Sequence, residues 1–429
     1  MDSGKASVHT RDVTTRRERF REYMARLRPA ENPARAIAEG LYVPHPSGSA
    51  VDEIITRLEL EPSSAHLVVG GIGSGKTTQL LVTERELNKV EDTRAIYLDV
   101  SEIHDISKMK PGGLVVVAGV VLARLLAADE EDINSARYKA RVAMQRFAHG
   151  HVKWVRLPDD IDPNEPEEDY DDDGGQYVKD EQLPFLAPPR REDLLPEVEK
   201  ASDLLRAVWE PLKAAKPHLV LLFDSLDRLT DMDAFGKLIE QDVEALRKLG
   251  IGVVLAGPLR MMYGAHRLVI TERFEDNFYP QMAVDVIRDE QGCRFLIEVL
   301  HKRVPPEVLP AEACLRLVES SGGVLRDLIS LTRASVEGAF RAGSQRVEAS
   351  HAETAARAFG GRFLFGLRKH EIDTLLRLQK TGIFIGSSDD ELALVTTQRI
   401  LAYAGEGGSW RYAIHPTLVP LLSQLKEAS

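Results

Sequence analysis

The chain has 429 residues, of which 43% are hydrophobic and 28% are charged, with a formal net charge of -12. These proportions are ordinary for a soluble globular protein, and the length allows about two or three domains of roughly 150 residues, which excludes one small module. Two cysteines, Cys293 and Cys314, exclude a disulfide framework and a Cys-rich metal site. The only membrane-like stretch, Val115 to Ala127, is shorter than the roughly 20 residues of a membrane span, and no secretory signal begins the chain. We therefore expect a cytoplasmic protein without a membrane partner.

The first predicted element is an arginine-rich helix from Thr14 to Arg28, within an N-terminal unit of residues 1–50. This helix could contact nucleic acid or a neighbouring subunit, and a solvated helix face is an equally good interpretation. A lead-in segment with Tyr42 and Val43 follows, and then an amphipathic helix near Val51 to Leu58.

Residues 70–77 read Gly-Gly-Ile-Gly-Ser-Gly-Lys-Thr, which is a complete phosphate-binding loop between an apolar strand and a helical pattern. Glycines let backbone N–H groups turn towards the β-phosphate, while the following helix directs its positive end at the same charge. Lys76 would reach the β- and γ-phosphates, and the Thr77 hydroxyl would hold magnesium. The pattern predicts that ATP and magnesium bind here, rather than a chance glycine-rich turn. The candidate binding residues are Gly70, Gly71, Gly73, Ser74, Gly75, Lys76, Thr77 and Thr78. In P-loop ATPases the segment before the loop often borders the base, so Tyr42 and Val43 are candidates for adenine contact.

Further strands are predicted at residues 94–100, 219–224, 252–258 and 282–286, separated by helices at 113–126 and 194–214. Continuous apolar strands that alternate with helices indicate an α/β core with a parallel sheet covered on both faces, here over residues 51–290. The ligand is then expected at the carboxyl ends of the strands, where the P-loop lies.

An acidic insertion of about residues 150–193 interrupts this core. Residues 159–173 contain ten carboxylates and no lysine or arginine, and so carry most of the net charge of -12. We interpret this segment as a solvated insertion loop, because it contains too little apolar surface to offset its ordering entropy. A nucleic-acid mimic or a docking strip for a basic partner is the alternative.

Residues 219–228, Leu-Val-Leu-Leu-Phe-Asp-Ser-Leu-Asp-Arg, place a carboxylate at the end of an apolar strand. Asp224 is the candidate for magnesium's second protein contact, usually made through water, and a helix-capping aspartate is the alternative. Hydrolysis also needs a group that orients or deprotonates the attacking water, and the position directly after Asp224 is Ser225 rather than a second carboxylate. Asp227 is the nearest substitute, unless it only pairs with Arg228. Hydrolysis is therefore expected to be slow.

The last two predicted units are helical and then mixed. Helices near 292–303, 311–320, 324–341 and 349–358 predict a helical lid over residues 291–365. In residues 366–429, a helix at 371–380 and an apolar run at 391–401 precede two strands, 400–404 and 410–414, around a glycine-rich loop. Helices followed by a β-hairpin indicate a C-terminal winged helix.

Together these motifs resemble the P-loop ATPases of the AAA+ and STAND groups, in particular the origin-recognition-like branch and its bacterial regulatory or defence-associated relatives. The resemblance rests on residues 70–78, 223–228, 256–258 and 321–328. It implies that Arg326 is the second sensor arginine, which reaches the γ-phosphate from the lid. A helix-surface arginine paired with Asp327 or Glu319 is the alternative.

The resemblance also implies an arginine finger offered to a neighbouring subunit, with Arg273 the best match before Arg260 and Arg267. A surface arginine without this role is the alternative for each of the three. A departure from the family lies at the end of the fourth strand, where Ala256, Gly257 and Pro258 replace the Asn, Ser or Thr of the first sensor.

The function expected from these features is a regulatory ATPase whose nucleotide state moves the lid and winged helix. It would control a protein effector or like subunits, and the resemblance implies bacterial signalling or antiphage defence. The alternative is a DNA-binding initiator or loader ATPase that uses the winged helix, although residues 387–391 and the wing residue Glu406 are poor in positive charge. A small-molecule P-loop kinase fits less well, because Lys76 and Asp224 lie far apart in sequence.

Overall fold

The computed structural model describes residues 5–28, 33–45, 50–127, 144, 194–213, 216–405 and 409–428. The predictions for the acidic insertion and for Glu406 at the wing tip lie outside these residues.

The elements follow the order expected from the sequence. The N-terminal part and core contain α1 (Lys5–Arg26), α2 (Pro33–Ala38), α3 (Ala50–Leu60), β1 (Ala65–Gly70), α4 (Lys76–Leu87), β2 (Thr93–Asp99), α5 (Val100–Ile103), α6 (Gly113–Ala127), α8 (Leu194–Trp209), β3 (His218–Asp224), α9 (Met232–Leu238), α10 (Glu244–Lys248), β4 (Ile251–Gly257), α11 (Arg267–Phe274) and β5 (Phe278–Gln281). The lid contains α12 (Glu290–His301), α13 (Ala311–Ser321), α14 (Leu325–Arg341) and α15 (Ala349–Leu364). The winged helix contains α16 (Lys369–Thr381), α17 (Asp389–Thr396), β6 (Ile400–Ala404), β7 (Trp410–Ile414) and α18 (Val419–Ala428).

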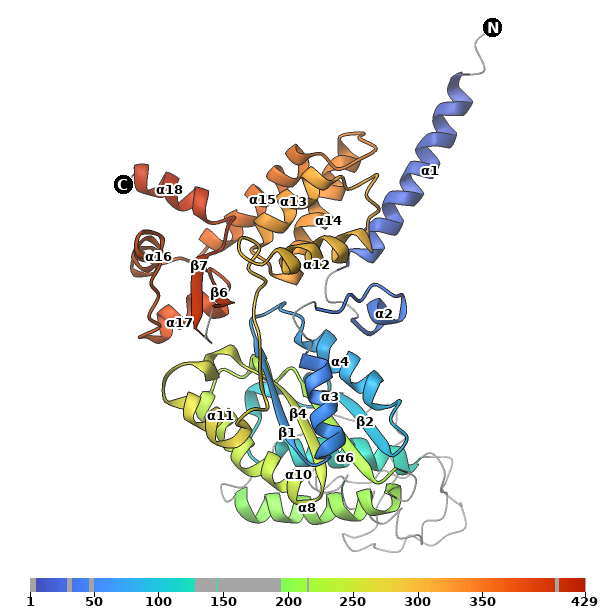
Figure 1. The fold of residues 1–429 in the computed structure, drawn as a ribbon, viewed down its shortest axis with the longest axis vertical. Helices are drawn as coiled ribbons and strands as arrows, with labels where there is room; N and C mark the ends of the chain where they lie inside the picture. Colours follow the sequence, from blue (N-terminus) through green and yellow to red (C-terminus); the bar gives the residue numbers. More distant parts are fainter. Residues whose placement is uncertain are drawn as a thin grey trace, which may run out of the picture.

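The core sheet has five parallel strands in the order β2-β3-β4-β1-β5 (Figure 1). Every residue of β1 and of β4 is buried, which explains why these strands read as continuous apolar runs. β4 lies between β1 and β3, so the strand that ends at Asp224 is not the direct neighbour of the strand that leads into the P-loop. The parallel sheet, the helical lid and the winged helix confirm the predicted fold class. The domain limits proposed from the sequence stay predictions.

The prediction of a fifth strand at residues 282–286 is wrong, because β5 ends at Gln281. The apolar residues that follow contact the lid instead. The Val284 N–H donates to the Gly323 carbonyl at 3.2 Å, and the Val284 side chain is buried in the apolar cluster of α12 to α15. An apolar run thus covers the lid rather than extending the sheet, a distinction that hydrophobicity alone cannot make.

The N-terminal helix α1 packs against the lid, while its first turns project away from it (Figure 1). Phe20, Tyr23 and Leu27 are buried on the lid side. Arg16 donates to the carbonyls of Ala339, Phe340 and Ser344 at 2.7–3.2 Å, at the C-terminal end of α14. A cation favours the negative end of a helix dipole, so at least one arginine of α1 has a structural role.

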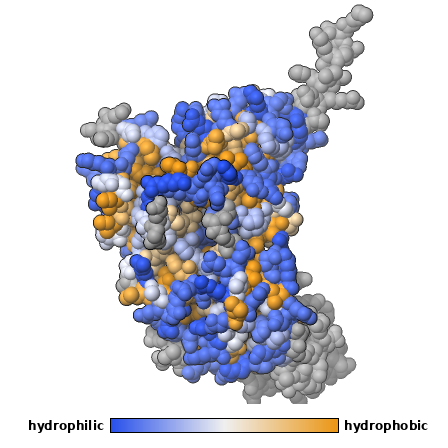
Figure 2. Space-filling model, viewed as in Figure 1, coloured by the Kyte–Doolittle hydropathy of each residue, from blue (hydrophilic) through white to orange (hydrophobic). Residues whose placement is uncertain are grey.

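The winged helix shares one continuous apolar cluster with the core, which includes Leu394, Val395 and Ile400. It also contacts the lid through buried polar groups, because His415 Nε2 lies 3.3 Å from Asp327 Oδ2. On the face drawn in Figure 2, apolar patches alternate with hydrophilic ones over the lid and winged helix, whereas the lower core is mostly hydrophilic. Among the described residues, no helix combines the length and apolar character needed to cross a membrane.

A buried carboxylate joins two core helices. Asp242, in a π-helical turn at Ile239–Val243, accepts from the N–H groups of Gly112 and Leu114 at 2.6 and 2.7 Å, where α6 begins. Burial raises the pKa of Asp242 from 3.8 to about 7, against the lowering effect of these backbone donors. A raised carboxyl pKa means that stability present at low pH is lost as the pH rises between these two values.

We therefore expect Asp242→Asn to remove this pH dependence, since an amide does not titrate. The melting temperature of the variant should increase relative to the parent as the pH rises from about 4 to about 7. Thermal melts across this range test the expectation, with Asp233→Asn, an exposed carboxylate, as control. A difference in melting temperature that does not vary with pH would contradict it.

Candidate nucleotide site

The P-loop connects the end of β1 to the start of α4 and has the backbone that the glycines predict. Gly73 and Gly75 have φ angles of 79° and 103°, a region that side-chain-bearing residues rarely adopt. At Gly70 a Cβ atom would lie 2.3 Å from the Gln281 carbonyl oxygen of β5. The loop is therefore closely confined by its neighbouring strand as well as shaped by its own backbone.

Lys76 is buried, and its ammonium group has three acceptors. Nζ lies 2.9 Å from Asp227 Oδ2, and donates to the carbonyls of Gly70 at 2.9 Å and Gly71 at 3.0 Å. A buried ammonium requires such compensation. In the nucleotide complex, phosphate oxygens would replace some of these acceptors. The Lys76 ammonium would then leave Asp227 and bind the phosphates.

Other polar groups at the loop suit a phosphate ligand. The Ser74 Oγ atom is buried and has no hydrogen-bond partner in the described part of the chain, although buried hydroxyls are usually paired. Thr77 and Thr78 are half-buried at the start of α4, whose N–H groups are not yet engaged within the helix. The orphaned hydroxyl and the helix start fit a bound polyphosphate with its cation.

Asp224 ends β3 on the sheet face that carries α4. Its carboxylate is 3% exposed: Oδ1 accepts from the Ser225 N–H at 2.7 Å, and Oδ2 accepts from the Tyr97 hydroxyl at 2.7 Å. The alternative role of Asp224 as a helix cap finds no support among the described residues, because its side chain makes no capping bond there. The next longer helix, α9, is capped by Asp231 instead. Tyr97 was not predicted from the sequence. The feature that could have indicated its contact with Asp224 is its position two residues before the end of β2, which places it on the same sheet face as Asp224.

Ser225 directly follows Asp224, and it has a left-handed backbone with φ of 69°. A non-glycine residue in this region is strained and often lies at a functional site. The turn leads into a short helix, Leu226–Arg228, which carries Asp227 to Lys76. The pairing of Asp227 with Arg228, considered from the sequence, is not among the ion pairs of the described residues.

The lid contacts the P-loop through the start of α14. The Arg326 N–H donates to the Gly73 carbonyl at 3.2 Å, and a Cβ atom on Gly73 would lie 2.4 Å from the Arg326 Cβ. The Arg326 side chain is exposed. Its two alternative partners are engaged elsewhere, since Asp327 lies beside His415 and Glu319 pairs with Arg316 at 3.5 Å. Arg326 is thus brought to the loop, and its guanidinium makes no ion pair with the described residues.

The lead-in segment bridges the core and the lid. Tyr42 packs against Val51 and Val82 on the α4 side, whereas Val43 is buried in the apolar cluster of the lid. The Leu41 carbonyl accepts from the Arg303 guanidinium at 3.1 Å. Tyr42 and Val43 therefore lie where α4 and the lid meet.

The other arginine candidates have different surroundings. Arg273 is exposed on α11, and no contact with the P-loop is found for it among the described residues. Arg260 forms an ion pair with Asp389 at the start of α17, so it contacts the winged helix. Pro258 precedes the short helix Leu259–Met262 that carries Arg260.

The winged helix also reaches the P-loop. The Gln398 side-chain amide donates to the Ile72 carbonyl at 2.5 Å, and Gln398 has a positive φ of 60°. Nearby, the Tyr403 hydroxyl donates to the Gly322 carbonyl at 3.0 Å, and Arg411 pairs with Asp285 at 2.5 Å. Sequence analysis did not single out Gln398, because nothing in its spacing indicates a contact with residue 72.

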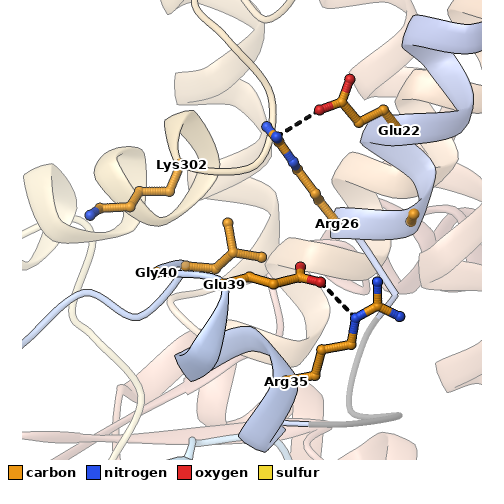
Figure 3. Close-up of a pocket in the computed structure, with 8 residues that line it drawn as sticks. Glu22, Arg26, Arg35, Glu39, Gly40 and Lys302 are labelled. Carbon is orange, nitrogen blue, oxygen red and sulfur yellow. Dashed lines mark hydrogen bonds and ion pairs between the residues drawn. The ribbon is translucent and has the colours of Figure 1, made fainter.

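A separate pocket of about 460 Å³ lies between α1, α2 and the end of α12 (Figure 3). Four of its charged groups pair locally, Glu22 with Arg26 and Arg35 with Glu39, both at 2.6 Å. No P-loop residue lines it. The groups suited to nucleotide phosphates are therefore those of the P-loop and not those of this pocket.

No family model matches the chain, and no curated protein is detectably similar in sequence. Solved structures with partial likeness include Drosophila ORC bound to DNA, with 13% identity, 95% of this chain and 92% of that chain covered, and a TM-score of 0.43. The Aeropyrum pernix ORC1 protein in complex with DNA has 13% identity, with 89% of this chain and 93% of that chain covered and a TM-score of 0.41. Cdc6p from Pyrobaculum aerophilum has 12% identity, with 94% of this chain and 98% of that chain covered and a TM-score of 0.42. At such identities and TM-scores these likenesses assign no function.

Proposed function

We propose that this protein is a regulatory ATPase that binds ATP with magnesium at the P-loop and hydrolyses it slowly. The observation that carries the proposal is that the lid and the winged helix both contact the P-loop. Arg326 binds the Gly73 carbonyl and Gln398 binds the Ile72 carbonyl. A ligand that reshapes residues 70–75 would therefore change the contacts of both units, which gives nucleotide a direct effect on their positions.

The roles follow from the chemistry of each group. Residues Gly70 to Gly75 would cradle the phosphates, with Thr78 behind them, and Lys76 would neutralise the β- and γ-phosphates. Thr77 and Asp224 would hold magnesium, which supplies charge neutralisation at the γ-phosphate when bound. Tyr42 and Val43 would border the adenine, between α4 and the lid.

Slow turnover is supported by the surroundings of Asp227. Its Oδ2 lies 2.9 Å from Lys76 Nζ, so the carboxylate is engaged by this cation. Asp227 would orient the attacking water only after Lys76 has turned to the phosphates. A rate limited by this exchange suits a nucleotide switch better than a motor.

Arg326 would sense the γ-phosphate from the lid, and Arg273 would act on the nucleotide of a neighbouring subunit. Exposure of Arg273 supports a role in trans. The family resemblance, together with these two arginines, supports control of like subunits or of a separate protein effector, as in bacterial signalling or antiphage defence.

A second candidate is a DNA-bound initiator or loader ATPase. The exposed side chains of Arg17, Arg19 and Arg21 on α1 favour it, since arginines suit phosphate backbones. The second helix of the winged helix, α17, is less suitable for base contact. Its first turn carries three carboxylates, and Asp389 and Asp390 already pair with arginines of this chain.

The mass in solution with and without ATP, magnesium and duplex DNA distinguishes these functions. A switch that acts on like subunits assembles with ATP and magnesium alone, whereas the second candidate gains mass only with DNA. No change in mass or conformation with any nucleotide would contradict both.

We expect Arg326→Ala to retain nucleotide binding but to lose the distinction between ATP and ADP, since only ATP offers the γ-phosphate. A tenfold loss in the ATP-to-ADP affinity ratio corresponds to about 1.4 kcal/mol. Limited proteolysis with each nucleotide would show equal protection of the lid. Arg333→Ala, about two turns further along α14, is the matched control and should behave as the parent. If Arg326→Ala keeps the parent's protection pattern, the lid is coupled through its backbone contact with Gly73 instead.

A further inference from the structure

Tyr97 is placed against the carboxylate proposed to hold magnesium. Its hydroxyl donates to Asp224 Oδ2 at 2.7 Å, across neighbouring strands of the sheet. Because the Ser225 N–H occupies Oδ1, each carboxylate oxygen has one fixed donor and keeps its remaining lone pairs for other ligands.

The tyrosine itself is held on two sides. Its backbone N–H donates to Glu84 Oε1 of α4 at 2.9 Å, and its ring packs in the apolar cluster between α4 and the sheet, which includes Leu80 and Leu222. A tyrosine hydroxyl is protonated near neutral pH, so it remains a donor to Asp224. The ring position and the proton are therefore both fixed.

Alternative donors for Asp224 Oδ2 are absent from the described contacts. Asp99, its partner in register on β2, is also a carboxylate and caps α5 by accepting from the Ser101 N–H at 2.9 Å. Two carboxylates on adjacent strands repel each other. Tyr97 offsets this repulsion at Asp224 and limits rotation of its side chain.

We propose that Tyr97 is a positioning residue that orients Asp224 for magnesium. This inference rests on the proposed function, in which Asp224 holds the metal. Hydrogen-bond partners of metal-binding carboxylates fix their orientation, and their loss typically lowers metal affinity by 10–100-fold.

Tyr97→Phe tests the proposal, because it removes only the hydroxyl. Mn²⁺ serves as the probe, titrated by electron paramagnetic resonance against the full chain with ADP. The Mn²⁺ dissociation constant should rise by about 10-fold or more, while ADP binding in EDTA stays unchanged. Tyr279→Phe is the matched control. It removes a tyrosine hydroxyl from the same apolar cluster, where it contacts His66 Nδ1 at 3.2 Å.

A double-mutant cycle separates positioning from a general structural effect. In the Asp224→Asn background, Tyr97→Phe should cost no further Mn²⁺ affinity, because it acts through the carboxylate. An equal loss in both backgrounds, an unchanged Mn²⁺ affinity in Tyr97→Phe, or an equal loss in Tyr279→Phe would overturn the proposal. If Asp224→Asn itself leaves Mn²⁺ affinity unchanged, the metal assignment of the proposed function fails instead.

Discussion

Lys76→Ala is expected to weaken ATP binding by about 100-fold or more and to abolish magnesium-dependent hydrolysis. Apart from Arg326, whose backbone N–H binds the Gly73 carbonyl, no other lysine or arginine is brought to the P-loop by the contacts of the described residues. Charge-assisted bonds between lysine and phosphate are about twice as strong as neutral ones, and each tenfold loss in affinity corresponds to about 1.4 kcal/mol. Calorimetric titration with ATP and with ADP measures the loss directly. Lys89→Ala, an exposed lysine that pairs with Glu86 just after α4, should bind as the parent does.

The same substitution also leaves Asp227 without its cation, which can lower stability independently of nucleotide. Asp227 is partly exposed, at 19%, so water reduces this cost. Lys76→Ala with Asp227→Asn separates the two effects: the melting temperature should recover towards that of the parent, while ATP binding should remain lost. Parent-like affinity in either folded variant would show that the nucleotide lies elsewhere.

The P-loop and the core strands were predictable because their determinants are local. Gly73 and Gly75 need positive φ angles, and the strands that form β1 and β4 are buried on both faces, so backbone chemistry and hydrophobicity indicate them directly. The four lid helices were also predicted, because each has an apolar stripe at helical spacing.

The contacts around the site were not predictable, since they join residues far apart in sequence. Tyr97 meets Asp224 only because β2 and β3 pair in a particular register, and Gln398 meets Ile72 only because the winged helix packs against the core. The error at residues 282–286 has the same origin. An apolar run that covers a lid and one that joins a sheet have equal hydrophobicity, and the tertiary structure decides between them.

Asp224→Asn should reduce hydrolysis by at least about 100-fold, which corresponds to ~2.7 kcal/mol of transition-state stabilisation. The amide should fold normally, because its oxygen can accept from the Ser225 N–H while its NH₂ group donates to the Tyr97 oxygen, a hydroxyl that can reverse its role. The substitution therefore removes the negative charge with little change in shape. Two measurements on this variant check the expectation. Single-turnover hydrolysis should be lost, whereas ATP binding without magnesium should be kept.

Asp99→Asn is the matched control, because Asp99 ends the adjacent strand in register with Asp224 but caps α5. It should keep hydrolysis close to that of the parent and lose little stability, because asparagine caps a helix about as well as aspartate does. If Asp99→Asn loses hydrolysis while Asp224→Asn retains it, the metal-holding carboxylate lies on β2 and not on β3. If both variants turn over ATP as the parent does, neither strand end holds the magnesium. The proposal that magnesium needs a carboxylate at the carboxyl end of one of these strands would then be wrong, although the P-loop could still bind nucleotide.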